Sequence, residues 1–145
     1  MSTNETDALV RLLKVLNDGM MFYKEAKKHV GHDLYPSLFE KHTSMREELI
    51  RDLQAVLFAK SGKIIDGHTV ASKLRLAYTN ILGMINDTDL TWVHQLEKIE
   101  VRTLNEMHKF MEHARNPEIL RIIRQKFPAI QRCHDEMRQL EITIS

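Results

Sequence analysis

A glutamate, Glu100, lies in the middle of an apolar stripe in the segment 90–114. If this segment is helical, each residue advances by about 100°, and the residues that share the face of Glu100 are apolar. They are Val93, Leu96, Leu104, Met107, Met111 and Ala114. A carboxylate on a buried face needs partners, because an isolated charge is very costly away from water. The sequence therefore predicts a buried polar group around Glu100, and its partners decide which chemistry is available.

Other predicted helices carry polar side chains on their own apolar faces. Two such residues fall within the stripe of the segment 34–60, two continue the stripe of the segment 117–142, and the first helix adds a tyrosine hydroxyl. Counting at about 1.5 Å per residue from the end that holds the first turn puts one residue of each helix at the same level. We therefore expect a buried polar layer of Tyr23, His42, Arg46, Glu100, Gln131 and His134.

Two interpretations of this layer remain open. In the first, Arg46 is the counter-ion of Glu100, because a guanidinium can bind a carboxylate through two donors, and the layer fixes the helix register without doing chemistry. In the second, one metal ion binds to two histidines and one or two acids, a ligand set most typical of zinc, with iron or manganese as alternatives. The predicted ligands are His42, Glu97, Glu100 and His134. The first interpretation predicts no cofactor.

The elements that position these residues are all predicted to be helices. The five Gly and three Pro stand where the periodic patterns stop. The predicted helices span residues 4–30, 34–60, 69–85, 89–115 and 117–142, in a single domain that covers residues 1–145. Four of them are long, and the shorter one, 69–85, belongs to a long crossover. The expected fold is therefore an all-α four-helix bundle of two antiparallel hairpins, with 34–60 and 89–115 parallel.

Composition excludes several classes of protein. The formal net charge is only +1, so we expect neither a nucleic-acid partner nor an anionic membrane surface. No uncharged apolar run approaches the length of a membrane helix. The single cysteine, Cys133, has no partner for an internal disulfide, and the first residues lack a secretory pattern, so a cytoplasmic location is expected. Val10 and Met21 share an outward direction on the first helix, which leaves a homodimer contact open.

The chain resembles the ferritin-like superfamily, whose four-helix bundles hold two metal ions on glutamates and histidines. The stretches LNDGMMFYKEAKKHV, SLFEKHTSMREEL, EKIEVRTLNEMHKFMEHA and AIQRCHDEMRQL are similar to a small bacterial ferritin-like family described as a domain of unknown function. The resemblance covers nearly the whole chain. It implies a ferritin-like bundle, and a role in stress response is what such relatives suggest.

The superfamily's ligand motif survives only in part. Glu100 matches the lone glutamate of the third long helix, and Gln131-x-x-His134 keeps the histidine of the fourth. On the second helix Thr43-x-x-Arg46 stands where Glu-x-x-His is expected, and Leu16, Gly19 or Met20 takes the place of the first glutamate. Too few carboxylates remain to balance two divalent ions. We therefore expect a non-catalytic bundle with a degenerate metal site; the alternative is a protein that binds one metal or a vestigial metal-dependent oxidase or iron-handling protein.

Overall fold

The computed structural model describes residues 1–63 and 88–145. Within these residues it contains four helices and no strand: α1 (Thr3–His29), α2 (Tyr35–Ser61), α4 (Asp89–His113) and α5 (Pro117–Ile144). Their ends differ from the predicted ends by at most two residues. The predicted crossover helix, 69–85, lies outside the described residues.

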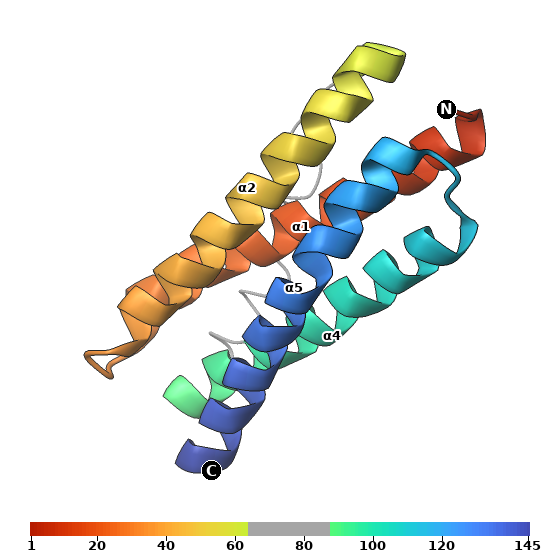
Figure 1. Cartoon of the computed structure of the whole chain (residues 1–145). Helices are drawn as coiled ribbons and strands as arrows, with labels where there is room; N and C mark the ends of the chain where they lie inside the picture. Colours follow the sequence, from red (N-terminus) through yellow and green to blue (C-terminus); the bar gives the residue numbers. More distant parts are fainter. Residues whose placement is uncertain (64–87) are drawn as a thin grey trace.

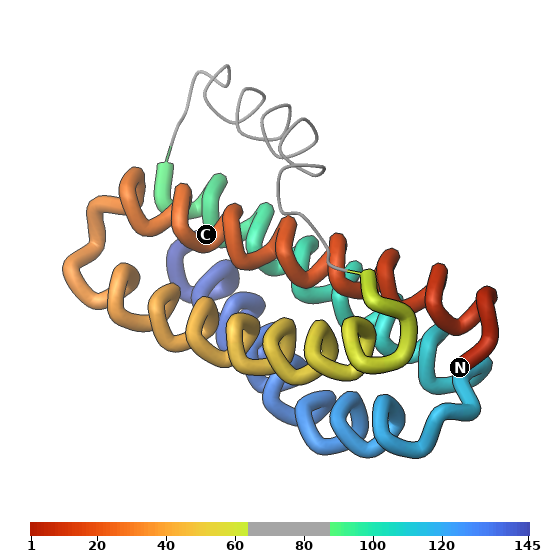
Figure 2. The backbone as a smooth tube through the Cα atoms, turned by 90° about the horizontal axis from the view of Figure 1, so that it is seen from above, coloured from red at the N-terminus to blue at the C-terminus, as the bar shows by residue number. Residues whose placement is uncertain are grey.

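The four helices form an all-α bundle built from two antiparallel hairpins, α1–α2 and α4–α5 (Figure 1). The second hairpin lies against the first, so that α1 also contacts α4, and α2 also contacts α5. Helices α2 and α4 run in the same direction, as the sequence predicted, and occupy diagonal corners of the bundle (Figures 1 and 2). The predicted all-α four-helix bundle is thus confirmed.

Local signals set the helix ends. The side chains of Ser2, Thr88 and Asn116 each accept a hydrogen bond from a backbone N–H in the first turn of α1, α4 and α5. Helix α2 ends at Gly62, whose φ of 71° is the left-handed conformation that glycine adopts without strain. These caps mark the beginnings of α1, α4 and α5 and the end of α2, and Asn116 lies in the turn of the second hairpin.

The turn between α1 and α2 is hydrogen-bonded to the start of α4. The Asp89 carboxylate accepts hydrogen bonds from the backbone N–H groups of Gly31, at 2.8 Å, and His32, at 3.0 Å. Asp89 is the first residue of α4, so one side chain fixes the end of one hairpin against the beginning of the other.

The apolar core consists of two clusters along the bundle axis. One cluster contains Leu9 to Leu16 of α1 together with parts of α2, α4 and α5, and the other is rich in aromatic residues around Phe22, Phe39 and Trp92. On every helix a short gap in the sequence separates the two clusters, and on α1, α2 and α4 these gaps hold all the buried polar residues of the described chain except Thr6. None of the described helices is long and apolar enough to cross a membrane.

Candidate functional site

A fully buried ion pair occupies the level between the two apolar clusters. Arg46 of α2 and Glu100 of α4 are both 0% exposed, and Nη2 of Arg46 donates to Oε1 of Glu100 at 2.8 Å. The same Nη2 donates to Oγ1 of Thr103 at 3.0 Å, and Nη1 donates to the Leu16 carbonyl at 3.5 Å. The guanidinium thus neutralises the carboxylate across the diagonal of the bundle and joins three of its helices.

The pair contacts through one nitrogen and one oxygen, not through the two-point geometry that the sequence suggested. The other nitrogen of the fork, Nε of Arg46, and the second oxygen, Oε2 of Glu100, are buried and have no hydrogen-bond partner. Oε1 of Glu100 instead accepts from two donors, Arg46 and Tyr23. The carboxylate is therefore held by one oxygen only.

Gly19 of α1 provides the space in which the guanidinium lies. A Cβ added at Gly19 would stand 2.4 Å from Nη1 of Arg46 and 2.6 Å from its Cζ, far inside van der Waals contact. The planar group therefore rests directly against the backbone of α1. The absence of a side chain at Gly19 thus leaves the space between α1 and α2 that Arg46 fills.

A chain of hydrogen bonds leads from the ion pair to the edge of the bundle. The Tyr23 hydroxyl donates to Oε1 of Glu100 at 2.7 Å, and Nδ1 of His42 lies 3.0 Å from the same hydroxyl. A neutral His42 carries one ring proton, so it donates a hydrogen bond either to the Tyr23 oxygen through Nδ1 or to Glu136 through Nε2. Nε2 of His42 lies 2.9 Å from Oε2 of Glu136 on α5, whose side chain is 36% exposed. The chain therefore joins all four helices and ends near solvent.

Burial sets the protonation of the neutral members of this layer. It raises the pKa of Tyr23 well above 10, and the neighbouring Glu100 charge adds to the rise. It lowers the pKa of His42 below 6.5, although the hydrogen bond to Glu136 opposes this. It also raises the pKa of the buried Cys133 thiol to about 12, again with a contribution from Glu100. At neutral pH the tyrosine and the thiol keep their protons and the imidazole is uncharged.

Arg46 keeps its charge in spite of complete burial. Desolvation alone would lower the pKa of the guanidinium, but the Glu100 carboxylate outweighs it, and the pKa is raised above its ordinary value. The Tyr23 ring lies 5.7 Å from Cζ of Arg46, within the range of a cation–π contact. Arg46 is therefore positively charged at neutral pH.

Two residues predicted for the layer lie elsewhere. Gln131 is exposed, so its predicted place inside the bundle is wrong. His134, whose side chain is 16% exposed, contacts Glu97 of α4 at 2.9 Å and its neighbour Asp135 at 3.2 Å. The reason is the orientation of α5, whose buried face in this half is centred on Ile130, Cys133 and Met137. The buried face predicted from the sequence, which included Gln131 and His134, is rotated about the axis of α5 from the face that is buried in the structure.

The four predicted metal ligands do not meet. Glu97 and His134 form a pair between α4 and α5, His42 contacts Glu136 and Tyr23, and Glu100 contacts Arg46. Across residues 1–63 and 88–145, no three His, Cys, Asp or Glu side chains lie together in an arrangement that could hold a metal ion. The sequence reasoning placed these residues at one level but could not tell which neighbours they face.

Two members of the layer were missed by the sequence reasoning, Thr103 and Glu136. Thr103 lies on the same side of α4 as Glu100, three residues on, and donates to the Ile99 carbonyl while accepting from Arg46. The buried stripe of α5 includes Cys133 and Met137. At about 100° per residue, His134, which follows Cys133, lies on one flank of this stripe, and Glu136, which precedes Met137, lies on the other. A wheel centred on Cys133 would have placed both residues beside the buried stripe, without telling which helix each of them faces.

The comparisons with known proteins give one match. No curated protein and no solved structure matches the chain. A family model matches residues 4–113, which is more than half of the chain and includes Tyr23, His42, Arg46 and Glu100 but not α5. The chain therefore belongs to the family described as "Domain of unknown function (DUF2383)".

Proposed function

We propose that this protein is a non-catalytic ferritin-like bundle in which an arginine–glutamate ion pair takes the place of a metal site, and that it acts through its surface as an interaction module. The observation that carries this proposal is the Arg46–Glu100 contact of 2.8 Å between two fully buried side chains. The ferritin-like relationship rests on the sequence resemblance, which would also connect the protein with stress response in the cytoplasm.

The residues present do not fit a di-metal centre. Arg46 fills the volume above Gly19 and brings a positive charge to the position where cations would bind. Glu100 is the one carboxylate of this layer that is completely buried, and the second, Glu136, lies at the edge. A divalent ion at Glu100 would have to displace the guanidinium, which would then be stranded without a partner in an apolar core.

The remaining groups of the layer are not poised for catalysis. The raised pKa values of Tyr23 and Cys133 keep both groups protonated at neutral pH, so neither is a ready base or nucleophile. Apolar clusters border the layer on both sides. Such a layer instead fixes the register of the four helices, because each polar contact is made in only one alignment.

The test begins with protein purified without an affinity tag. Elemental mass spectrometry should find no stoichiometric zinc, iron or manganese, and a chelator should leave the melting curve unchanged. About one metal ion per chain, together with a melting temperature that falls on chelation, would overturn the proposal. Two ions per chain would also overturn it and would reopen the question of oxidase activity.

Two variants test the ion pair itself. Arg46→Leu should destabilise the metal-free protein by about 3–5 kcal/mol, because it leaves the Glu100 charge buried without its counter-ion. The matched control, Arg46→Leu with Glu100→Leu, should recover most of this loss, since replacing both partners by apolar residues is close to neutral. A protein that held one metal on Glu100 would respond in the opposite way: Arg46→Leu would be tolerated and would strengthen metal binding.

A further inference from the structure

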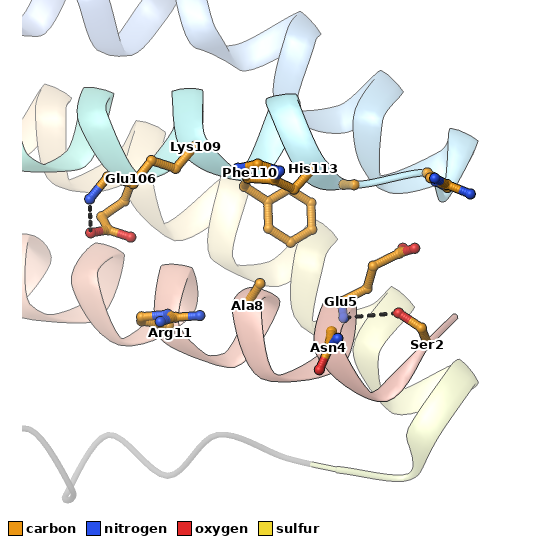
Figure 3. Close-up of a pocket in the computed structure, with 11 residues that line it drawn as sticks. Ser2, Asn4, Glu5, Ala8, Arg11, Glu106, Lys109, Phe110 and His113 are labelled. Carbon is orange, nitrogen blue, oxygen red and sulfur yellow. Dashed lines mark hydrogen bonds and ion pairs between the residues drawn. The ribbon is translucent and has the colours of Figure 1, made fainter.

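A pocket of about 640 Å³ lies between the beginning of α1 and the end of α4 (Figure 3). It is separate from the ion-pair layer, which lies further along both helices. The residues that line it are Ser2, Asn4, Glu5, Ala8, Arg11, Glu106, Lys109, Phe110, His113, Ala114 and Arg115. Its volume is in the range of pockets that bind small organic molecules.

The base of the pocket is apolar. The Phe110 side chain extends from α4 toward α1, and Ala8 lies opposite it on α1 (Figure 3). Phe110 is only 4% exposed, so its ring is held in place by the core cluster and does not move freely on the surface. The accessible edge of this ring and Ala8 together give the pocket an apolar base.

The walls are charged, with an excess of positive groups. The lining contains three cationic side chains, Arg11, Lys109 and Arg115, and two carboxylates, Glu5 and Glu106. Within the described part of the chain neither arginine has a hydrogen-bond or ion-pair partner. Lys109 has only a long contact to Glu106, 3.8 Å, and Glu5 already accepts from the backbone N–H of Asn116.

We propose that this pocket binds a small amphipathic anion, namely an aromatic carboxylate or sulfonate. Its apolar part would lie against Ala8 and the accessible edge of Phe110, and its anionic group would bind Arg11 or Arg115, which lie toward opposite ends of the pocket. Guanidinium groups without a carboxylate partner are well suited to this, because they bind oxyanions through paired donors. This inference goes beyond the proposed function and does not depend on it.

The test uses two probes that differ only in charge. The anion 8-anilinonaphthalene-1-sulfonate becomes fluorescent when it binds an apolar site, and N-phenyl-1-naphthylamine has the same ring system without the sulfonate. We expect saturable binding of the anion to the folded full chain, on the order of tenfold tighter than binding of the neutral probe. Equal affinities for the two probes, or no saturable binding, would overturn the inference.

Three variants locate the binding site. Arg11→Gln with Arg115→Gln should weaken binding of the anion on the order of tenfold and leave the neutral probe unaffected. Arg124→Gln, an exposed α5 arginine outside the pocket, is the matched control and should change neither affinity. Ala8→Trp should fill the pocket and reduce binding of both probes, provided that its circular dichroism remains that of the wild type.

The results separate clearly. If Arg124→Gln weakens the anion as much as the Arg11 and Arg115 changes do, the probe senses only overall charge and the inference fails. If the arginine changes have no effect on the anion, the site is not in this pocket, and the inference fails whatever Ala8→Trp does.

Discussion

Gly19→Ala is the change that tests the ion-pair layer most directly. The alanine Cβ would lie 2.4 Å from Nη1 and 2.6 Å from Cζ of Arg46, whose side chain is 0% exposed. The group cannot stay where it is and has no solvent to move into. We therefore expect the alanine to break the contact between Arg46 and Glu100 rather than to be absorbed by a small adjustment.

The size of the effect follows from two opposing contributions. In a helix interior alanine is favoured over glycine by about 1 kcal/mol. Breaking one side of a buried ion pair costs about 3–5 kcal/mol, because both charges are left without adequate partners. The net loss for Gly19→Ala should therefore be about 2–4 kcal/mol, which corresponds to a fall in melting temperature of roughly 5–15 °C for a chain of this size.

The assay is urea unfolding followed by circular dichroism, with two comparisons. Gly31→Ala is the control: its Cβ would meet only Asp89 Oδ1 at 3.9 Å, and its stability should change by less than about 0.5 kcal/mol. In the second comparison, Gly19→Ala is combined with Arg46→Met. In that background the alanine no longer meets a guanidinium, so it should become neutral or stabilising, and the two changes should be far from additive.

Either of two results would refute this reasoning. A Gly19→Ala protein as stable as the wild type would mean that the guanidinium does not rest against α1. Additive losses in Gly19→Ala and Arg46→Met would mean that the alanine destabilises the bundle for a reason unrelated to Arg46.

Three further predictions concern protonation, reactivity and the helix turn. The pKa of His42 is lowered on folding, so as the pH falls the unfolded state takes up a proton before the folded state does. The contribution of His42 to the free energy of unfolding should therefore be fully present above about pH 6.5 and be lost below it, by at most about 1.4 kcal/mol per pH unit. In His42→Gln this part of the acid slope should be missing from urea midpoints measured between pH 7 and 5, and an unchanged slope would contradict the assignment. Cys133, with a pKa of about 12 and a buried side chain, should resist iodoacetamide at pH 8 until the protein is unfolded, as mass spectrometry would show; rapid labelling of the native chain would count against its place in the core. Asp89→Ala should lower the free energy of unfolding by about 1–3 kcal/mol, because the backbone N–H groups of Gly31 and His32 lose a charged acceptor. Asp89→Asn keeps one acceptor oxygen and should lose less. Equal losses in the two variants would show that the two hydrogen bonds do not matter.

The sequence alone determined the helices and the presence of a buried polar group. The caps at Thr88 and Asn116 and the stop at Gly62 are local signals, and the positions of the helices follow from them. Glu100 and Arg46 could be identified because each interrupts an apolar stripe on its own helix, and such an interruption needs no knowledge of other elements.

Only the tertiary structure decided which polar residues meet. The rotation of α5 about its axis depends on how its side chains pack against α2 and α4, and a modest rotation exchanges Gln131, which is exposed, for Glu136, which contacts His42. A helical wheel has no information on this, because several faces of α5 carry apolar residues. For the same reason the pairing of His134 with Glu97 could not be distinguished from a shared site with His42 and Glu100.

Gly19 shows the difference most clearly. In the sequence it is a glycine on an apolar helical face, with a cost in helix propensity and no visible benefit. In the structure it is the point at which an arginine from α2 reaches the backbone of α1, where any Cβ would collide with the guanidinium. The sequence supplied both residues, but their fit depends on the distance between two packed helices, which is set by the whole core.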